Sequence, residues 1–359
     1  MRISKENLRL ATAESPGLVR REPRVPLPKA PVLCADSPLD LDWRTMSLLE
    51  APVVAHVVRA SFVESVHRGL AVVTAPDGTV ERAWGDPNTP VLPRSSLKPL
   101  QAVAMLRAGA ALAGEALALA CASHSGEDAH LAGVRAALAA SGLDEEALRN
   151  TPDRPVGEDA LAAWLASGRG KERVAQNCSG KHAGMLAACL AAGWDTATYL
   201  DPQHPLQRLI TDVVAELTGS PVVATVTDGC GAPVHAFELA GLARALGRIA
   251  SAPSGPEARV AAAMVSHPWF VGGTNRPDSV LMADVPGVIA KEGAEAVLAV
   301  GLPDGRGVAV KIADGARAAR VVGAAVLGML GVDPDAVARL GDVPVLGHGE
   351  RVGSVVAVL

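Results

Sequence analysis

A serine and a lysine three residues apart are the first candidates for chemistry in this sequence. The stretch Arg94-Ser-Ser-Leu-Lys-Pro99 opens a helical pattern, and we expect Ser95 to be the N-cap of that helix. Residues i and i+3 share one helix face, so Lys98 would lie beside Ser95. Burial of that face would lower the pKa of the lysine, and a neutral amine can deprotonate a serine and make it a nucleophile. Taken alone, the pair is more typical of a capped helix with a solvated lysine than of a catalytic pair.

A second polar cluster ends an apolar helical stretch. Cys121-Ala-Ser-His-Ser-Gly-Glu127 places four polar side chains within five residues. One of its two serines could be a second hydroxyl at a reacting centre or an oxyanion donor. The alternative is a helix end stopped by serine and glycine, with His124 as a cap.

Two cysteines stand in glycine-rich polar segments. Cys178, in NCSGKHAG, is expected at a helix N-terminus, where the dipole favours a thiolate. Cys230, in TDGCGAP, is flanked by glycines on a predicted strand-to-helix turn and is expected to be exposed. Together they could give two thiolates to Zn²⁺, with a third ligand between them. The simpler interpretation of Cys230 is an incidental thiol on a turn, and the five cysteines of the chain do not indicate a disulfide framework.

Two further segments carry charged residues in suggestive places. Lys291-Glu-Gly293 is a K-x-G triplet, which lines the substrate cleft on a strand in serine β-lactamase-like enzymes. Arg68, in VESVHRG, could hold a substrate carboxylate by a bidentate pair. Each has a plainer alternative, a solvent-exposed strand end for the triplet and a charged strand edge for Arg68.

The elements that must position these residues follow from hydrophobic periodicity. Strands are expected at both ends of the chain, with Asp77-Gly78 as a hairpin turn near the first end. The middle of the chain is helical, which predicts an α/β (α+β) fold with one sheet made from both ends and an inserted helical region. The expected helices are 97–108, 113–120, 130–140, 159–166, 181–192, 205–217, 234–246, 256–265 and 316–330, and the expected strands lie within 51–75, 296–300, 308–312 and 355–358.

Composition narrows the function classes. The 359 residues carry a net charge of −5 with no basic stripe, and only 3 % are aromatic, so nucleic-acid binding is disfavoured. No apolar run reaches the ~20 residues of a membrane span. Residues 1–46 are rich in proline and charge and have no signal sequence, so we interpret them as a tail or upstream extension. Residues 47–359 then form the catalytic domain, and the cytoplasm is the expected location.

The motifs together resemble one family, the zinc-containing L-asparaginases of the asparaginase II family, of the rhizobial inducible type. The matching stretches span roughly residues 52–315 and leave the first 46 residues outside; they are VESVHRG, RSSLKPLQ, CASHSGE, NCSGKHAGML, DGCGAPVHAFEL and KEGAE. The resemblance implies a fold related to serine β-lactamases and glutaminases. It also implies a homodimer, a Zn²⁺ cofactor and hydrolysis of L-asparagine to L-aspartate and ammonia.

The resemblance also implies roles for particular residues. It implies two Ser–Lys tandems, Ser95 with Lys98 and Ser123 with Lys291, with Ser125 and Lys311 as rivals for the second tandem. The implied metal ligands are Cys178, Lys181 and Cys230, and the implied substrate-binding residues are Arg94, His182 and Asp228. Two alternatives remain: a glutaminase or other serine amidase, and a non-catalytic zinc-binding module.

Overall fold

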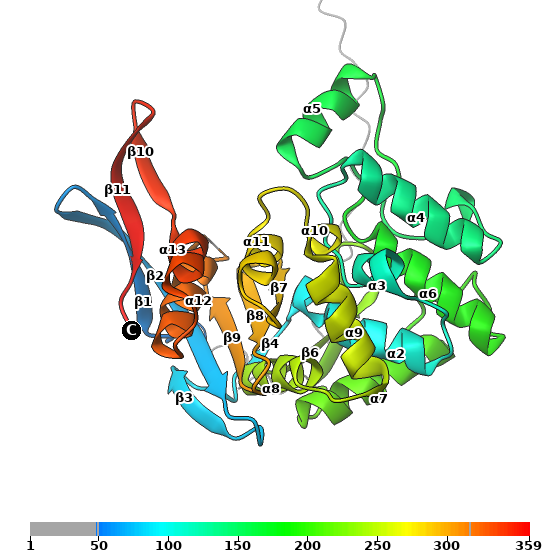
Figure 1. Cartoon of the computed structure of the whole chain (residues 1–359), viewed down its shortest axis with the longest axis horizontal. Coiled ribbons are helices and arrows are strands. Elements are labelled where there is room, and N and C mark those ends of the chain that lie inside the picture. The colour runs from blue at the N-terminus through cyan, green and yellow to red at the C-terminus, as the bar shows by residue number, and fades with distance from the viewer. Residues whose placement is uncertain (1–47, 49, 316) are drawn as a thin grey trace, which may run out of the picture. The chain divides into compact units, whose positions relative to one another are not determined.

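Both ends of the chain build one antiparallel sheet, as predicted (Figure 1). The computed structural model describes residues 48, 50–315 and 317–359, so the predicted tail at 1–46 lies outside the described residues. The sheet runs in the order β10-β11-β1-β2-β9-β8-β7, and β3 pairs with β2. Its strands are β1 (Val53–Arg59), β2 (Phe62–Thr74), β3 (Val80–Trp84), β7 (Ile289–Gly293), β8 (Val297–Gly301), β9 (Gly307–Ile312), β10 (Pro344–Gly347) and β11 (Glu350–Ala357).

The expected hairpin near the N-terminal end is confirmed. β2 and β3 pair across a turn in which Gly78 has φ +87°, a conformation that favours glycine. The Asp77 carboxylate accepts hydrogen bonds from the backbone N–H and the hydroxyl of Thr79 and closes this turn.

Most of the elements between β3 and β7 are helices, which confirms the inserted helical region (Figure 1). They are η1 (Arg94–Leu97), α2 (Lys98–Arg107), α3 (Gly114–Ala120), α4 (Asp128–Ala140), η2 (Glu145–Ala147), α5 (Glu158–Ala166), α6 (Ser179–Ala192), α7 (Pro205–Thr218), α8 (Leu239–Ala250), α9 (Gly255–Ser266), α10 (Pro268–Val271) and α11 (Pro277–Asp284). Two more, α12 (Ala318–Met329) and α13 (Pro334–Gly341), lie between β9 and β10.

The helix predicted over 234–246 is wrong in its first part. Pro233–Glu238 is a strand, β6, which pairs with β5 (Ala224–Thr227) and β4 (Pro90–Val91) in a second, three-stranded sheet, and α8 begins only at Leu239. Five of the six residues of β6 are buried. A strand buried on both faces shows no alternation of apolar and polar residues, so periodicity could not separate it from a helix.

The main sheet is covered on opposite faces by α8 and α12. Gly301 of β8 and Gly307 of β9 pair with each other and lie directly under the backbone of α8. Leu298 is offset by an odd number of residues from Gly301, so it points to the other face, where it meets Gly323 of α12. This close approach is one way in which a chain poor in aromatic residues reaches interior packing density.

Every helix within the described residues is too short or too polar to cross a lipid bilayer.

The contact between α8 and the sheet leads to a prediction of stability. A methyl group on Gly301 would collide with the carbonyl oxygen of Leu246, which is backbone and cannot rotate away. We therefore expect Gly301→Ala to lower the free energy of unfolding by about 1–3 kcal/mol in urea denaturation. Gly170→Ala is the matched control, because no atom lies within 4 Å of its added methyl group, and it should change stability by less than about 0.5 kcal/mol. Equal stability of the two variants would contradict this account of the packing.

Candidate active site

The segment before α2 has an unusual backbone. Arg94 has φ +52°, a left-handed conformation that is uncommon for a residue with a side chain and is often found at functional sites. Ser95 follows it inside η1, and α2 begins three residues later at Lys98. The expectation that Ser95 caps the helix is therefore wrong, because Leu97 occupies the N-cap position and no side chain caps the helix there. Ser95 is half-buried and its hydroxyl forms no hydrogen bond with another described residue.

Lys98 is buried and points to the segment that follows α3. Its Nζ donates to the carbonyl oxygen of Ala122 and, over 2.9 Å, to Oγ of Ser123. Lys98 and Ser123 are 1 % and 5 % exposed. The rival serine, Ser125, instead donates its hydroxyl proton to Glu127 over 2.6 Å. Of the two serines in CASHSGE, it is thus Ser123 that contacts Lys98.

The surroundings of Lys98 favour its neutral form. Burial lowers the pKa of Lys98 below its ordinary value, because the charged amine loses its hydration. Cys178 opposes this shift, while the positive charges of Lys291 and Lys181 add to it. Lys98 therefore has the character of a base as well as the position of one.

Cys178, Lys181 and Cys230 converge beside Lys98. Cys178 occupies the N-cap position of α6, as predicted, and Lys181 lies in the first turn of that helix. Nζ of Lys181 lies 3.1 Å from Sγ of Cys230, and Cys178 packs in one buried cluster with Cys230. All three side chains are at most 4 % exposed. The prediction that Cys230 is exposed is wrong: its turn joins β5 to β6, and with Gly231 at φ +90° it lies against Cys178 and Leu200.

The pKa values of the two thiols, Cys178 and Cys230, are shifted in opposite directions. The hydrogen bond from Cys178 and the nearby ammonium of Lys181 lower the pKa of Cys230 to about 5, although burial opposes the shift. The hydrogen bond to Cys230 and burial raise the pKa of Cys178 to about 12. The thiolate at neutral pH is therefore Cys230, and not Cys178 at the helix N-terminus, because an adjacent thiolate outweighs the helix dipole.

Arg94 and Asp228 form an ion pair at the edge of this cluster. Nε of Arg94 donates to Oδ1 of Asp228 over 2.6 Å, and the side chains are 25 % and 10 % exposed. Asp228 also accepts from the backbone N–H of Gly229, which orients its carboxylate. A cation and an anion thus lie side by side near Ser95, where both remain partly accessible.

His182 lies on α6 and is completely buried. Its Nδ1 is 2.8 Å from the hydroxyl of Tyr199, and its Nε2 has no hydrogen-bond partner among the described residues. Burial holds the pKa of His182 well below 6.5, so the imidazole is neutral. An unpartnered ring nitrogen of this kind is available to a ligand or a water molecule.

Lys291 occupies β7, and sheet register decides which face it takes. It pairs with Ala299, which shares the α8 face with Gly301, so Lys291 points toward the inserted helices. Its Nζ lies 2.9 Å from Oδ2 of Asp278. The rival Lys311 donates instead to the carbonyl oxygens of Glu295 and Ile312.

Some residues of this region had no signal in the sequence. Asp278 stands in the first turn of α11, where an acidic residue is common for reasons of the helix dipole alone. Thr274 binds the carboxylate of Glu127 through its backbone N–H and its hydroxyl, and the pairing across 147 residues has no local pattern. Arg68 is exposed and donates to the carbonyl oxygen of Ala51, but β2 pairs with both β1 and β9, so the alternative of a charged strand edge is wrong.

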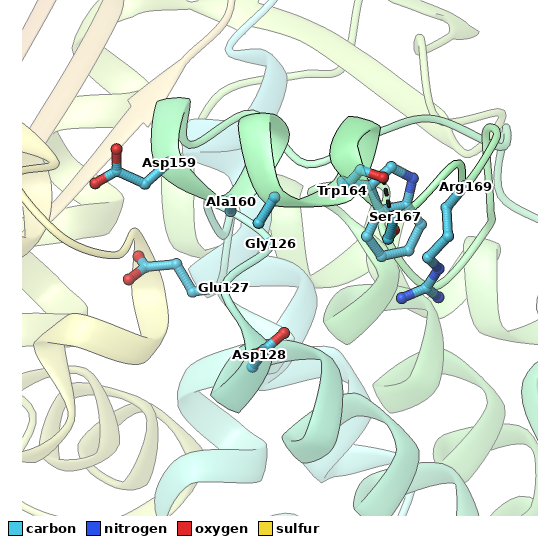
Figure 2. Close-up of a pocket in the computed structure, with 9 residues that line it drawn as sticks. Gly126, Glu127, Asp128, Asp159, Ala160, Trp164, Ser167 and Arg169 are labelled. Carbon is cyan, nitrogen blue, oxygen red and sulfur yellow. Dashed lines mark hydrogen bonds between the residues drawn. The ribbon is translucent and has the colours of Figure 1, made fainter.

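A cavity of about 510 Å³ lies next to this region, between α5 and the start of α4 (Figure 2). The guanidinium of Arg169 stacks over the ring of Trp164 at 3.4 Å, and the Ser167 hydroxyl donates to the Trp164 carbonyl oxygen. The lining residues are Gly126, Glu127, Asp128, Asp159, Ala160, Ala163, Trp164, Ser167 and Arg169. None of the predicted site residues is among them, so the cavity is separate from the Ser–Lys cluster.

Known proteins resemble this chain at two levels. The sequence model of the L-asparaginase II family matches residues 55–357. The chain belongs to the L-asparaginase II family. This membership confirms the predicted family and makes the protein an amidohydrolase. No curated protein matches this asparaginase II chain. A solved β-lactamase from Mycobacterium bovis is similar over 79 % of this chain and 97 % of its own, with 18 % identity and a TM-score of 0.43.

The contacts of Glu127 lead to a prediction. Burial raises the pKa of Glu127, but the hydrogen bonds from Ser125 and Thr274 outweigh it and hold the pKa below 4.5. The charge therefore stabilises the fold above the unfolded-state pKa, and this stabilisation is lost as pH falls through the folded-state pKa. We expect Glu127→Gln to lower the free energy of unfolding by about 1 kcal/mol at pH 7, with the difference disappearing in acid. Urea denaturation at several pH values measures this.

The control for this prediction is Glu81→Gln. Glu81 is exposed on β3 and makes no side-chain hydrogen bond with another described residue. The free energy of unfolding of Glu81→Gln should therefore stay within about 0.5 kcal/mol of the wild type. A loss in Glu127→Gln that does not depend on pH would show that its charge is not what matters.

Proposed function

We propose that this family member hydrolyses L-asparagine to L-aspartate and ammonia by Ser–Lys nucleophilic catalysis. The observation that carries the proposal is the buried Lys98, whose amine contacts Ser123 at 2.9 Å and which follows Ser95 by three residues. A buried lysine with a depressed pKa, in contact with the hydroxyl of Ser123 and three residues after Ser95, is an arrangement that can activate a hydroxyl. A non-catalytic module would have no need for it.

The ion pair of Arg94 and Asp228 supports an amino-acid substrate. Free L-asparagine carries one carboxylate and one ammonium group on the same carbon. The guanidinium of Arg94 can bind the carboxylate, and the carboxylate of Asp228 can bind the ammonium. The pair at 2.6 Å is thus complementary to the carboxylate and ammonium groups of the free amino acid, and it leaves the side-chain amide for the serines.

The proposed reaction proceeds in two halves. Ser95 Oγ attacks the side-chain amide carbon as its proton passes to Lys98, and the C–N bond breaks as Lys98 gives this proton to the nitrogen, which leaves as ammonia. Water then attacks the acyl-serine ester as Lys98 takes a proton from it, the ester C–O bond breaks as Lys98 returns that proton to Ser95 Oγ, and L-aspartate is released. Ser123, which contacts Lys98, is proposed to relay this proton.

Substitution of the serines tests the scheme. We expect Ser95→Ala to lower kcat for ammonia release from L-asparagine by about 10³-fold or more, because the nucleophile is lost. Ser123→Ala should lower kcat less, because it removes only a relay partner of Lys98. Ser96→Ala is the matched control: the Ser96 hydroxyl donates to the Pro93 carbonyl oxygen and takes no part in the chemistry, so kcat should be retained.

Three results would revise the proposal. Near-full turnover of Ser95→Ala with an inert Ser123→Ala would make Ser123 the nucleophile. Faster ammonia release from L-glutamine than from L-asparagine would identify a glutaminase. The absence of ammonia release from either amide by folded wild-type protein would favour the non-catalytic zinc-binding alternative.

We also propose that Cys178, Lys181 and Cys230 bind Zn²⁺. Within residues 48, 50–315 and 317–359, no group of three or more His, Cys, Asp or Glu side chains could hold a metal ion, so this site requires the lysine as its third donor. The donor chemistry fits: a thiolate, a second thiol beside it and an amine 3.1 Å away converge in a buried cluster. When bound, the metal would supply a fixed positive charge beside Arg94 and Asp228 that orients the substrate.

Lys181 makes this site sensitive to protons. Burial lowers the pKa of Lys181, but the adjacent thiolate of Cys230 outweighs burial and raises it above its ordinary value. An ammonium has no lone pair, so binding of a metal must release its proton.

Metal analysis of substituted proteins tests the zinc site. We expect about one zinc per chain in the wild type and a loss of about 10-fold or more in zinc affinity in Cys230→Ser, because a hydroxyl is a poor zinc ligand. Cys189→Ser is the control, since Cys189 is a buried free thiol at the other end of α6 and should leave zinc content unchanged. A zinc-free wild type purified without chelators, or equal zinc in both variants, would exclude this ligand set.

We further propose a homodimer, which the family resemblance implies. Exposed apolar side chains on the two hairpins at the sheet's end support a partner surface there, among them Phe62 at 70 % and Leu346 at 56 % exposure.

A further inference from the structure

An ion pair is buried at the point where β7 meets α11. Nζ of Lys291 lies 2.9 Å from Oδ2 of Asp278, and neither side chain has any exposed surface. Nζ also donates to the carbonyl oxygen of Glu292. Each charge thus has its counter-charge in contact and no access to water.

Asp278 is itself held from two sides. Its Oδ1 accepts from the backbone N–H of Ser279 in the first turn of α11, and its Oδ2 faces the backbone N–H of Glu292 at 3.4 Å. Burial raises the pKa of Asp278, but Lys291 outweighs it and keeps the pKa below the ordinary value. The carboxylate is therefore a charged and rigidly oriented acceptor for the lysine.

Stability does not explain such a pair. Two buried charges lose their hydration, and a buried ion pair is often no more stabilising than two apolar side chains of the same volume. The pair does place a positive charge near the catalytic cluster, since β7 lies against η1, which carries Ser95: a Cβ on Gly293, two residues after Lys291, would meet the Pro93 carbonyl oxygen and the Ser96 backbone nitrogen. It also occupies Lys291 with a carboxylate, while Ser123 has Lys98 as its amine partner.

We propose that Asp278 is a positioning residue which holds Lys291 as a fixed cation on β7, the strand that lies against the segment carrying Ser95. Lys291 then does not serve Ser123 as a base; its charge stabilises the negative charge that develops on the substrate. This inference rests on the proposed amidohydrolase reaction and changes the role of the second lysine within it. Asp278 touches no reacting atom and acts through Lys291.

Two substitutions of Lys291 separate a cation from a base. Arginine keeps the positive charge but cannot lose its proton, whereas methionine removes the charge. We expect Lys291→Arg to retain kcat within about 10-fold of the wild type, and Lys291→Met to lose about 100-fold or more, with KM for L-asparagine changed less than about 3-fold in both. If Lys291→Arg folds as stably as the wild type yet is as slow as Lys291→Met, Lys291 is a base and the proposal is wrong.

A double-mutant cycle tests whether Asp278 acts through Lys291. Asp278→Asn should lower kcat about 10-fold or more, and the double variant Asp278→Asn/Lys291→Met should be no slower than Lys291→Met alone. Additive losses would show that Asp278 acts independently of Lys291 and would overturn the proposal. Asp284→Asn is the matched control, because Asp284 ends the same helix and pairs with Arg339 at the surface, and its kcat should stay within 2-fold.

Folding and substrate identity are controlled separately. Removal of one partner can leave a buried unpaired charge, so the thermal stability of each variant is measured. The double variant carries neither charge, and its comparison with Lys291→Met and Lys291→Arg decides the question even if Asp278→Asn does not fold. Serine labelling by a fluorophosphonate, read over the same series, follows nucleophile activation without any amide substrate. If the wild-type protein is labelled but releases no ammonia from L-asparagine, the proposed substrate is wrong, whereas the proposed role of Asp278 is not contradicted.

Discussion

Three lysine side chains are fully buried near one another, and the need to compensate the lost hydration of each amine constrains the whole site. Lys98, Lys181 and Lys291 are among the largest side chains that lose all contact with solvent. Each loses the hydration of its ammonium group, so each needs a partner or must give up its proton. The partners differ in kind: a carbonyl and a hydroxyl for Lys98, a thiolate for Lys181 and a carboxylate for Lys291. Only Lys98 has no anion as its nearest partner, and it is the lysine best suited to accept a proton.

The fold brings these three lysines together from distant parts of the chain. Lys98 begins α2, Lys181 lies in the first turn of α6, and Lys291 is on a strand of the terminal sheet. Lys291 reaches the site because the sheet alternates its side chains, which places this residue on the face of the inserted helices and Glu292 on the other. α6 packs closely on α3 because Gly180 has no side chain. A Cβ at this position would collide with the Leu119 carbonyl oxygen. The site thus depends on the close helix packing at Gly180 and on the alternation of side chains along β7 as much as on its charged residues.

At Arg94, beside the site, a strained backbone conformation and an ion pair occur in the same residue. Arg94 keeps its left-handed backbone while its guanidinium is bound to Asp228, which belongs to the β5–β6 turn. The same turn carries Cys230, so one short loop contributes to the proposed binding of the substrate and to the proposed metal site. A backbone conformation that costs free energy is expected where several contacts hold it in place.

The sequence by itself determined the family, the residue types and most of the elements. Motifs such as RSSLKPLQ and NCSGKHAGML are local, and helical periodicity is local as well, so both are visible without a structure. The tertiary structure alone decided the partners. It paired Lys98 with Ser123, gave Lys291 to Asp278 and placed the thiolate on Cys230, because a contact over many residues, a sheet register and the electrostatics of a buried cluster leave no trace in local spacing. For the same reason the local pattern predicts a helix where β6 lies, since the burial of β6 on both faces comes from strands and helices elsewhere in the chain.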